Sequence, residues 1–309
     1  CTIFAFVESP HEQGVFWAGS DDGLVHISRD GGDTWTDVTP PGVEPWTLIS
    51  MIEASPHDPA TAYVAATRYK LDDNRPMLYK TNDYGATWTA ISGNLPESDF
   101  TRCVREDPTQ QGLLFAGTET GIYVSSDDGG SWRSLRVNLP VAPVYDIIVK
   151  DDDLVAATHG RSFWIMDDLT QLRQLTGDVS SQAVRLLKPG LTHRLGPTGG
   201  RGMPSSVKSY QLGLGAVATS TESTDDTGQT TRKFLDAGQN PPGGVRVHYW
   251  LADEPEGEIT LSFLDKDGGE IKTFTSAKSD KDADDGPAEP RLTKSSGLNR
   301  FDWNTRYAD

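Results

Sequence analysis

The chain has 309 residues, of which 36% are apolar and 24% charged, and its formal net charge is −17. This composition is typical of a soluble globular protein with a packed core. Its acidic surface repels phosphate backbones and so excludes nucleic acid as an expected partner. Without a run of eighteen apolar residues, the sequence predicts no membrane span.

The N-terminal residues CTIFAFV form a strand-like pattern. A cysteine in first position is typical of a lipid-modified lipoprotein, but a polar linker usually follows such an anchor. The strand directly after Cys1 therefore favours a boundary within a longer chain. Cys103, in the alternating run TRCVRE, is expected to be a small core residue, and two cysteines are too few for a disulfide framework.

An eight-residue pattern, S/T-x-D-x-G-x-S/T-W, occurs at residues 28–35, 81–88 and 125–132. Two apolar runs precede each copy. The first is VFWAGS, AYVAAT or LLFAGT, and the second, which leads directly into the pattern, is LVHIS, MLYKT or IYVSS. A fourth unit, YDIIVKDDD followed by LVAATHGRSFWIMDD, lacks the pattern. A unit of four short strands repeating about every 45 residues predicts the blades of a β-propeller.

The pattern itself is expected to hold a turn between the third and fourth strands of each blade. Its aspartate and hydroxyl side chains bond backbone N–H groups, its glycine supplies unusual dihedral angles, and its tryptophan packs between sheets. A catalytic device is not expected three times on the outer rim. The residues given this structural role are Ser28, Asp30, Gly32, Trp35, Thr81, Asp83, Gly85, Trp88, Ser125, Asp127, Gly129 and Trp132.

These turns resemble the Asp-box, or bacterial neuraminidase repeat, of sialidases, sortilin-type propellers and two-propeller xyloglucan hydrolases. The stretches GTETGIYVSSDDGGSW, THGRSFWIMDDLTQLRQL, NPPGGVRVHYWL and GLNRFDWNTRY are similar to the C-terminal portion of large bacterial secreted proteins of the sortilin-like or glycosyl-hydrolase-like kind. The resemblance implies a secreted, periplasmic or cell-surface location, and missing N-terminal blades as a partner of this chain. Sialidase activity is not expected, because the arginine-isoleucine-proline motif of that family is absent.

The predicted fold is therefore all-β in three parts. Residues 1–175 form four four-stranded blades of a partial propeller, the last one degenerate. Residues 176–244 are a loop-rich, partly disordered connection. Residues 245–309 alternate again and predict a β-sandwich of immunoglobulin or fibronectin type, incomplete if the natural chain continues.

In a propeller, the loops between second and third strands and the connections between blades share the face on which ligands usually bind. Four residues on these loops are candidates for catalysis: Asp21, Asp22, Glu119 and His159. Five are candidates for ligand binding: Arg68, Tyr69, Arg161, Trp46 and Arg102.

The leading hypothesis is a propeller that binds a glycan or a peptide. Arg68 and Arg161 would hold a carboxylate by paired hydrogen bonds, and Tyr69, Trp46 and Phe100 would offer stacking surfaces.

Two other functions remain open. A glycoside hydrolase would use a carboxylate pair, Glu119 with Asp21 or Asp22. A structural or assembly module would use the propeller and the sandwich as interaction surfaces.

Structural interpretations of the same residues also remain open. The stretch SDDG predicts a tight turn, His159 suits a structural hydrogen bond, and Arg161 suits an ion pair with Glu119 or Asp146. No metal cluster or cofactor motif is expected, and calcium held by the Asp-Asp pairs has little support from their spacing.

Overall fold

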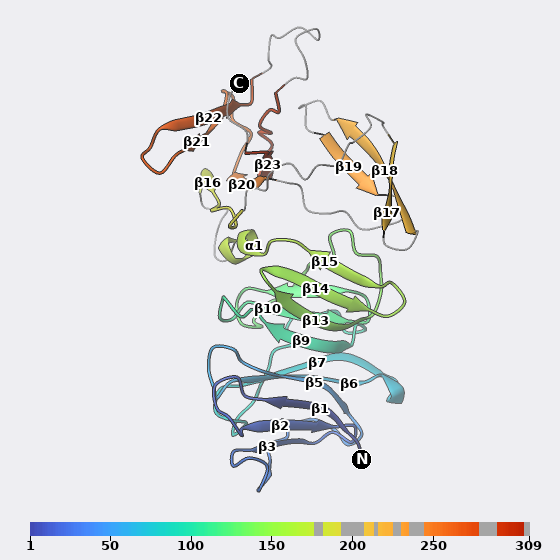
Figure 1. The fold of residues 1–309 in the computed structure, drawn as a ribbon. Helices are drawn as coiled ribbons and strands as arrows, with labels where there is room; N and C mark the ends of the chain where they lie inside the picture. The colour runs from blue at the N-terminus through green and yellow to red at the C-terminus, as the bar shows by residue number, and fades with distance from the viewer. Residues whose placement is uncertain are drawn as a thin grey trace. The chain divides into compact units, whose positions relative to one another are not determined.

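The computed structural model describes residues 1–175, 182–192, 207–212, 216–224, 230–234, 244–277 and 289–305. The chain divides into two compact units, Cys1–Leu169 and Thr170–Asp309. Both consist mainly of antiparallel strands, which confirms the all-β class (Figure 1). Within the described residues, no helix is long and apolar enough to cross a membrane.

The first unit contains four antiparallel sheets, each formed by consecutive strands. The first sheet is β1 (Ile3–Glu8), β2 (Phe16–Ser20), β3 (Val25–Ser28) and β4 (Thr36–Asp37). The second is β5 (Leu48–Ala54), β6 (Ala62–Arg68), β7 (Asp73–Thr81) and β8 (Thr89–Ala90). The third is β9 (Thr101–Glu106), β10 (Leu114–Thr118), β11 (Ile122–Ser125) and β12 (Arg133–Ser134). The fourth is β13 (Val144–Lys150), β14 (Asp153–Thr158) and β15 (Phe163–Met166).

These sheets follow one another in space as in the chain (Figure 1). The first strands of neighbouring sheets touch: β1 contacts β5, β5 contacts β9, and β9 contacts β13. Apolar side chains fill the space between sheets, with Trp17 and Ile49 buried between the first two and Val104 and Trp132 in the next core. This layering, with the first strands of neighbouring sheets in contact, is like that of consecutive propeller blades.

The fourth sheet departs from the prediction of four four-stranded blades, because it has three strands. Its sequence lacks the repeated turn that reverses the chain after the third strand. After β15 the backbone takes a positive φ of 63° at Asp168, and the buried Leu169 donates its N–H to the carbonyl of Asp152. The chain then enters the short helix α1 (Thr170–Gln174) instead of a fourth strand.

The three repeated turns share one hydrogen-bond pattern. In the first, Asp30 accepts the backbone N–H of Thr34 at 2.9 Å and its hydroxyl at 2.6 Å, while Ser28 accepts the N–H of Gly32 at 2.9 Å. The other two copies repeat these bonds around Asp83 and Asp127. The bonds from Thr34 hold the pKa of Asp30 below its ordinary value. These carboxylates are therefore committed to the turn.

All four first strands carry an irregularity at the same place. The register with the second strand shifts around one extra residue, which is Phe4, Ser50, Arg102 or Tyr145. A β-bulge re-aims the side chain it carries and often lies beside a functional site. These equivalent bulges give Arg102 and Tyr145 matching positions on adjacent sheets.

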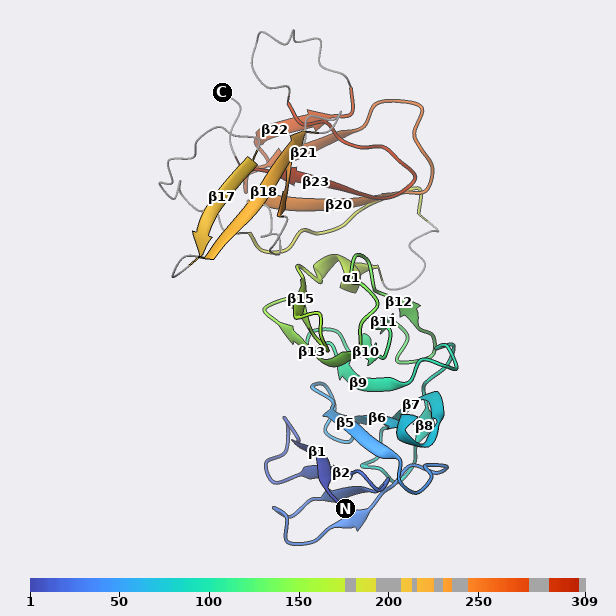
Figure 2. The same ribbon diagram turned by 90° about the vertical axis from the view of Figure 1, so that its right-hand side faces the viewer.

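The described residues of the second unit form three small sheets (Figure 2). One is formed by β16 (Val184–Leu186), β20 (Val245–Leu251) and β23 (Gly297–Trp303). The hairpin of β21 (Thr260–Leu264) and β22 (Glu270–Thr275) shares a hydrophobic core with this sheet. In that core the ring centres of Phe274 and Phe301 are 4.6 Å apart. The sandwich of immunoglobulin or fibronectin type stays a prediction.

The third sheet of this unit falls in the segment expected to be loop-rich. It consists of β17 (Val207–Leu212), β18 (Ala216–Thr224) and β19 (Thr230–Phe234). With β16, four of the described strands thus lie within residues 176–244. The rest of the predicted disorder falls mostly on residues outside the described ranges. Short polar strands rich in threonine and serine carry too weak an apolar alternation to be found by pattern.

Candidate ligand-binding surface of the first unit

Three of the predicted candidates occupy equivalent positions in the loops that follow second strands. Asp21, Glu119 and His159 each donate a backbone N–H to the residue two places before the bulge of their own sheet. The acceptors are the carbonyls of Thr2 at 3.0 Å, Phe100 at 3.1 Å and Pro143 at 2.8 Å. In the first, third and fourth sheets the repeat therefore places one such residue near the bulge.

Two of these loop side chains contact the bulge residue directly. The Nε and Nη2 atoms of Arg102 donate to one carboxylate oxygen of Glu119 at 2.8 and 2.6 Å. The ring centre of His159 lies 5.3 Å from that of Tyr145. In the first sheet, Asp21 instead accepts the N–H of Thr2 at 2.7 Å, as a turn-holding aspartate does.

Aromatic side chains continue this arrangement from sheet to sheet. Tyr69 stacks on Phe100 with ring centres 4.9 Å apart and planes inclined by 7°. The guanidinium of Arg102 lies 4.8 Å from the ring centre of Phe100 and 4.1 Å from that of Tyr145. Together with His159, these residues form what we call the aromatic stack, which joins the second, third and fourth sheets.

A pocket of about 270 Å³ lies beside the aromatic stack. Trp46 stands in its wall with 65% of its surface exposed, on a backbone with a φ of 65°, and its N–H donates to the carbonyl of Asp22 at 2.9 Å. A tryptophan in the left-handed region is strained, and such strain is concentrated at functional sites. The pocket is lined by Asp21, Trp46, Leu48, Thr67, Arg68, Tyr69, Lys70 and Leu71.

The inserted loop of the second sheet provides much of this pocket. It contains the short helix η1 (Tyr69–Leu71) and a left-handed Asp72, before β7 begins. Arg68 pairs with Glu44 at 2.6 Å and lies 3.8 Å from Asp73. Hydrogen bonds from the Arg75 guanidinium lower the pKa of Asp73 to about 2. The charge of Arg68 is thus balanced, whereas Lys70 in the same loop is exposed.

The remaining candidates lie as follows. Asp22 has one carboxylate oxygen buried without a hydrogen-bond partner. Arg161 is exposed at the tip between β14 and β15, and its carbonyl accepts the indole N–H of Trp164 at 2.8 Å. The acids that Arg161 was expected to pair with are bound to other arginines: Glu119 to Arg102, and Asp146 to Arg105 at 3.0 Å.

Sequence reasoning missed Tyr145, whose ring stacks against the guanidinium of Arg102. Its position could have been found by aligning VYDI with TRCV, since Tyr145 then falls on Arg102. No group of three or more metal-ligating side chains occurs in the part of the chain that the structure describes.

No family model matches the chain. Among curated proteins, a xyloglucanase from Paenibacillus sp is 25% identical over 137 residues, and xyloglucanase Xgh74A from Acetivibrio thermocellus is 28% identical over 98 residues. These matches cover 40% and 28% of this chain. They span only 13% and 12% of the relatives' own lengths.

Solved structures overlap more of the chain at lower identity. The GH74 xyloglucanase from Xanthomonas campestris has a TM-score of 0.44 and 13% identity, over 80% of this chain and 42% of that one. The structure of YCF48 bound to D1 peptide has a TM-score of 0.39 and 16% identity, over 80% of this chain and 75% of that one.

Proposed function

We propose that the first unit binds a neutral polysaccharide chain across the pocket of Trp46 and the adjoining aromatic stack. The observation that carries this proposal is the exposed Trp46, held on strained backbone over a pocket that also contains Tyr69 and Asp21. An aromatic face beside carboxylate and ammonium groups suits a sugar ring, which has apolar faces and a rim of hydroxyls.

The charges favour a neutral glycan over an acidic one. Arg68 and Arg102, the two partly buried arginines of this surface, are already paired with Glu44 and Glu119. A ligand carboxylate would have to displace these partners, and the net charge of −17 would repel it. Lys70 and Arg161 remain exposed and suit hydrogen bonds to hydroxyls.

The size of the pocket fits one part of a longer ligand. Its volume of about 270 Å³ is below the roughly 300–1,000 Å³ of pockets that enclose a whole small molecule. The rest of a polysaccharide would lie along the neighbouring loops. Xyloglucan, named for both curated relatives, is the first ligand to test.

The test is calorimetric titration with xyloglucan oligosaccharides. Trp46→Ala is expected to weaken binding by about 1–2 kcal/mol, roughly tenfold, as loss of a central aromatic contact does. Trp35→Ala is the matched control, because Trp35 is also exposed but lies in the turn at the opposite end of β3. Binding that is equal in both variants, or absent in the wild-type protein, would refute the proposal.

Glycoside hydrolysis is the second candidate, favoured by the names of the curated relatives. It requires two carboxylates, one acting as acid and the other as base or nucleophile. Glu119 is bound by Arg102, and Asp21 by Thr2, so both would have to leave their present partners. Release of reducing ends from xyloglucan that disappears in Glu119→Gln or Asp21→Asn would establish hydrolysis.

Binding of a polysaccharide implies a secreted, periplasmic or cell-surface location, which belongs to this proposal. We also propose that this chain is part of an Asp-box propeller protein of the sortilin-like or glycosyl-hydrolase-like kind. The three turns around Asp30, Asp83 and Asp127 support that membership through their common hydrogen-bond pattern.

A further inference from the structure

The tryptophans of the second and third repeated turns are each hydrogen-bonded to the preceding sheet. The indole Nε1 of Trp88 donates to the carbonyl of Val38 at 2.7 Å, and that of Trp132 donates to the carbonyl of Ile91 at 2.7 Å. Val38 comes directly after β4, and Ile91 comes directly after β8. The same bond therefore joins the first sheet to the second and the second to the third.

The glycines of these two turns make room for the same neighbouring residues. A Cβ on Gly85 would lie 2.7 Å from the Cβ of Val38, and one on Gly129 would lie 2.7 Å from the Cβ of Ile91. Real carbon atoms do not approach so closely, so a side chain at either position would push the two sheets apart. The glycine and the tryptophan thus hold the branched residue after the fourth strand of the preceding sheet.

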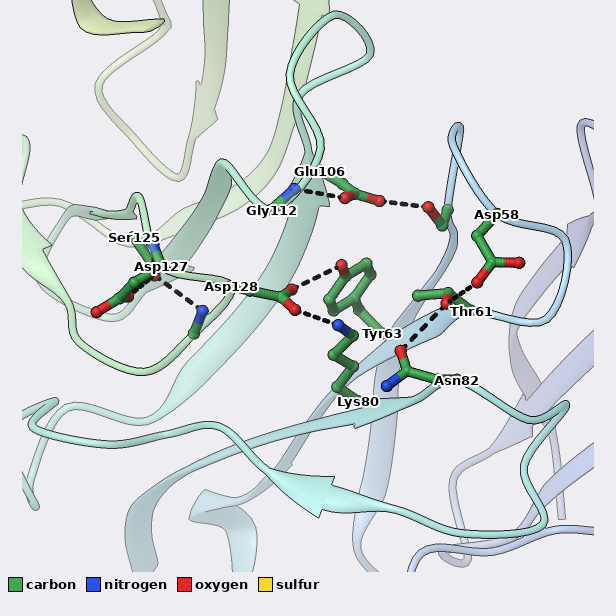
Figure 3. Close-up of polar contacts among 12 residues, drawn as sticks. Asp58, Thr61, Tyr63, Lys80, Asn82, Glu106, Gly112, Ser125, Asp127 and Asp128 are labelled. Carbon is green, nitrogen blue, oxygen red and sulfur yellow. Dashed lines mark hydrogen bonds and ion pairs between the residues drawn. The ribbon is translucent and has the colours of Figure 1, made fainter. Parts of the chain in front are cut away.

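The residue before that glycine adds a polar contact across the same boundary. Tyr84 donates its hydroxyl to Glu12 of the first sheet's loop at 3.0 Å. Asp128 accepts the hydroxyl of Tyr63 at 3.0 Å and pairs with Lys80, both from the second sheet (Figure 3). Each described boundary between sheets joined by the repeated turn therefore has both an apolar and a polar contact.

The first sheet carries the same parts without a partner. Trp35 is 41% exposed and donates back to the carbonyl of Gly32 in its own turn at 3.1 Å, whereas Trp132 is 3% exposed. A Cβ on Gly32 would meet nothing within 4 Å. Phe4 and Phe6, on β1, are 59% and 58% exposed. A pocket of about 250 Å³ lies on this face, lined by Ile3, Ala18, Gly19, Ser20, Leu24, His26 and Trp35.

The described part of the chain offers no free partner for this face. The ends after the fourth strands of the first two sheets, Val38 and Ile91, are taken by Trp88 and Trp132. The third sheet packs against the fourth, since β13 contacts both β9 and β10, and the residue after its fourth strand is Leu135 and not a Val or Ile. The fourth sheet has no fourth strand. A second copy of these residues therefore could not supply the same contact.

We propose that the open face of the first sheet, formed by Phe4, Phe6, Leu24, Gly32 and Trp35, is an interface for a further four-stranded antiparallel sheet. That sheet comes from polypeptide outside these 309 residues. Directly after its fourth strand it presents a branched apolar side chain to Gly32 and a backbone carbonyl to Trp35. The structure contains this contact between sheets twice, and the proposal adds a third instance at the first sheet.

Photo-crosslinking tests the identity of the occupant. A benzophenone amino acid replaces Trp35 in the protein as its natural source produces it, and the crosslinked peptide is identified by mass spectrometry. The expected peptide lies outside residues 1–309 and contains a Val or Ile directly after a short strand that follows a turn of the repeated type. A peptide from within residues 1–309 would show a second copy instead, and no crosslink would leave the face uncovered; either result overturns the proposal. The same replacement at Trp132 is the positive control, with Ile91 as the expected target.

Oxidation of tryptophan tests the same interface without a substitution. N-bromosuccinimide oxidises exposed indoles, and peptide mapping gives the rate for each one. In the naturally produced protein, Trp35 should react as slowly as the buried Trp132, while the exposed Trp46 reacts rapidly. In residues 1–309 alone, Trp35 should react faster than Trp132. A Trp35 that reacts equally fast in both proteins would contradict the proposal.

Discussion

Arg102 places two N–H groups on a single carboxylate oxygen of Glu119, at 2.8 and 2.6 Å. The arginine comes from the bulge of β9, and the glutamate from the loop between β10 and β11. Because the guanidinium also lies 4.1 Å from the ring centre of Tyr145, this one side chain connects the third sheet to the fourth. The pair therefore has a structural role, and it also fixes the positions of Glu119 and Tyr145 for any ligand that binds at this surface.

Arg102→Lys should destabilise the first unit although it keeps the charge. A lysine cannot reproduce the planar fork or the stacking on Tyr145, and hydrogen bonds to a charged group contribute about 1.5–3 kcal/mol. The free energy of unfolding in urea should fall by about that amount. Arg133→Lys, at an exposed position on β12, is the control and should have little effect. Equal losses in both variants would contradict this role.

Trp132→Phe should destabilise the boundary between the second and third sheets. It leaves the carbonyl of Ile91 without its indole donor, and an unsatisfied buried polar group costs about 1–3 kcal/mol. In residues 1–309 alone, Trp35→Phe removes an indole that is exposed and bonded only to its own turn, so its effect there should stay within about 0.5 kcal/mol. Denaturant unfolding of both variants measures the difference. A larger loss for Trp35→Phe would contradict the described packing.

Acid should weaken the three repeated turns. Hydrogen bonds from hydroxyl and N–H groups, chiefly those of Thr34 and Thr87, lower the pKa values of Asp30 and Asp83 in the folded state. A lowered carboxyl pKa stabilises the fold above the unfolded-state value, and this contribution is lost as the pH falls below about 4. The melting temperature should therefore fall less steeply between pH 6 and pH 3 when Asp30→Asn, Asp83→Asn and Asp127→Asn are combined. An unchanged steepness would show that these groups do not carry the effect.

The two cysteines should differ in reactivity. Cys1 is exposed, whereas Cys103 is fully buried, and burial raises the pKa of its thiol to about 12. Because the thiolate is the reactive form, iodoacetamide should add to Cys1 alone in the folded protein and to both residues after unfolding in guanidinium. Intact-mass spectrometry counts the adducts. Labelling of Cys103 at the same rate as Cys1 in the folded state would contradict the described core.

The part of the fold that the sequence predicted is the part that contains the repeated turn. Alternating apolar runs bounded by Asp30, Asp83 and Asp127 located three four-stranded sheets, because each turn is local and its residues have few other uses. The fourth sheet has no fourth strand because its sequence lacks the repeated turn that would reverse the chain after β15. The strands β17 to β19 escaped prediction, because their side chains show no clear alternation.

The candidate surface was predicted less completely than the fold. The repeat register placed Asp21, Glu119 and His159 in equivalent loops, and the structure shows the same backbone bond at each. The partners of Arg68 and Arg102 could not be predicted, because they depend on how loops from different sheets meet. The bulges were equally hidden, since an extra residue in a strand changes its pairing without changing its composition.

The most direct test of the proposed binding surface follows the indole N–H signals of the protein by NMR during titration with xyloglucan oligosaccharides. The signal of Trp46, assigned from its loss in Trp46→Phe, should shift with the ligand concentration. The signals of Trp35 and Trp132, in the repeated turns, should stay in place. A Trp46 signal that does not move at saturating ligand, or shifts confined to Trp35, would contradict the account.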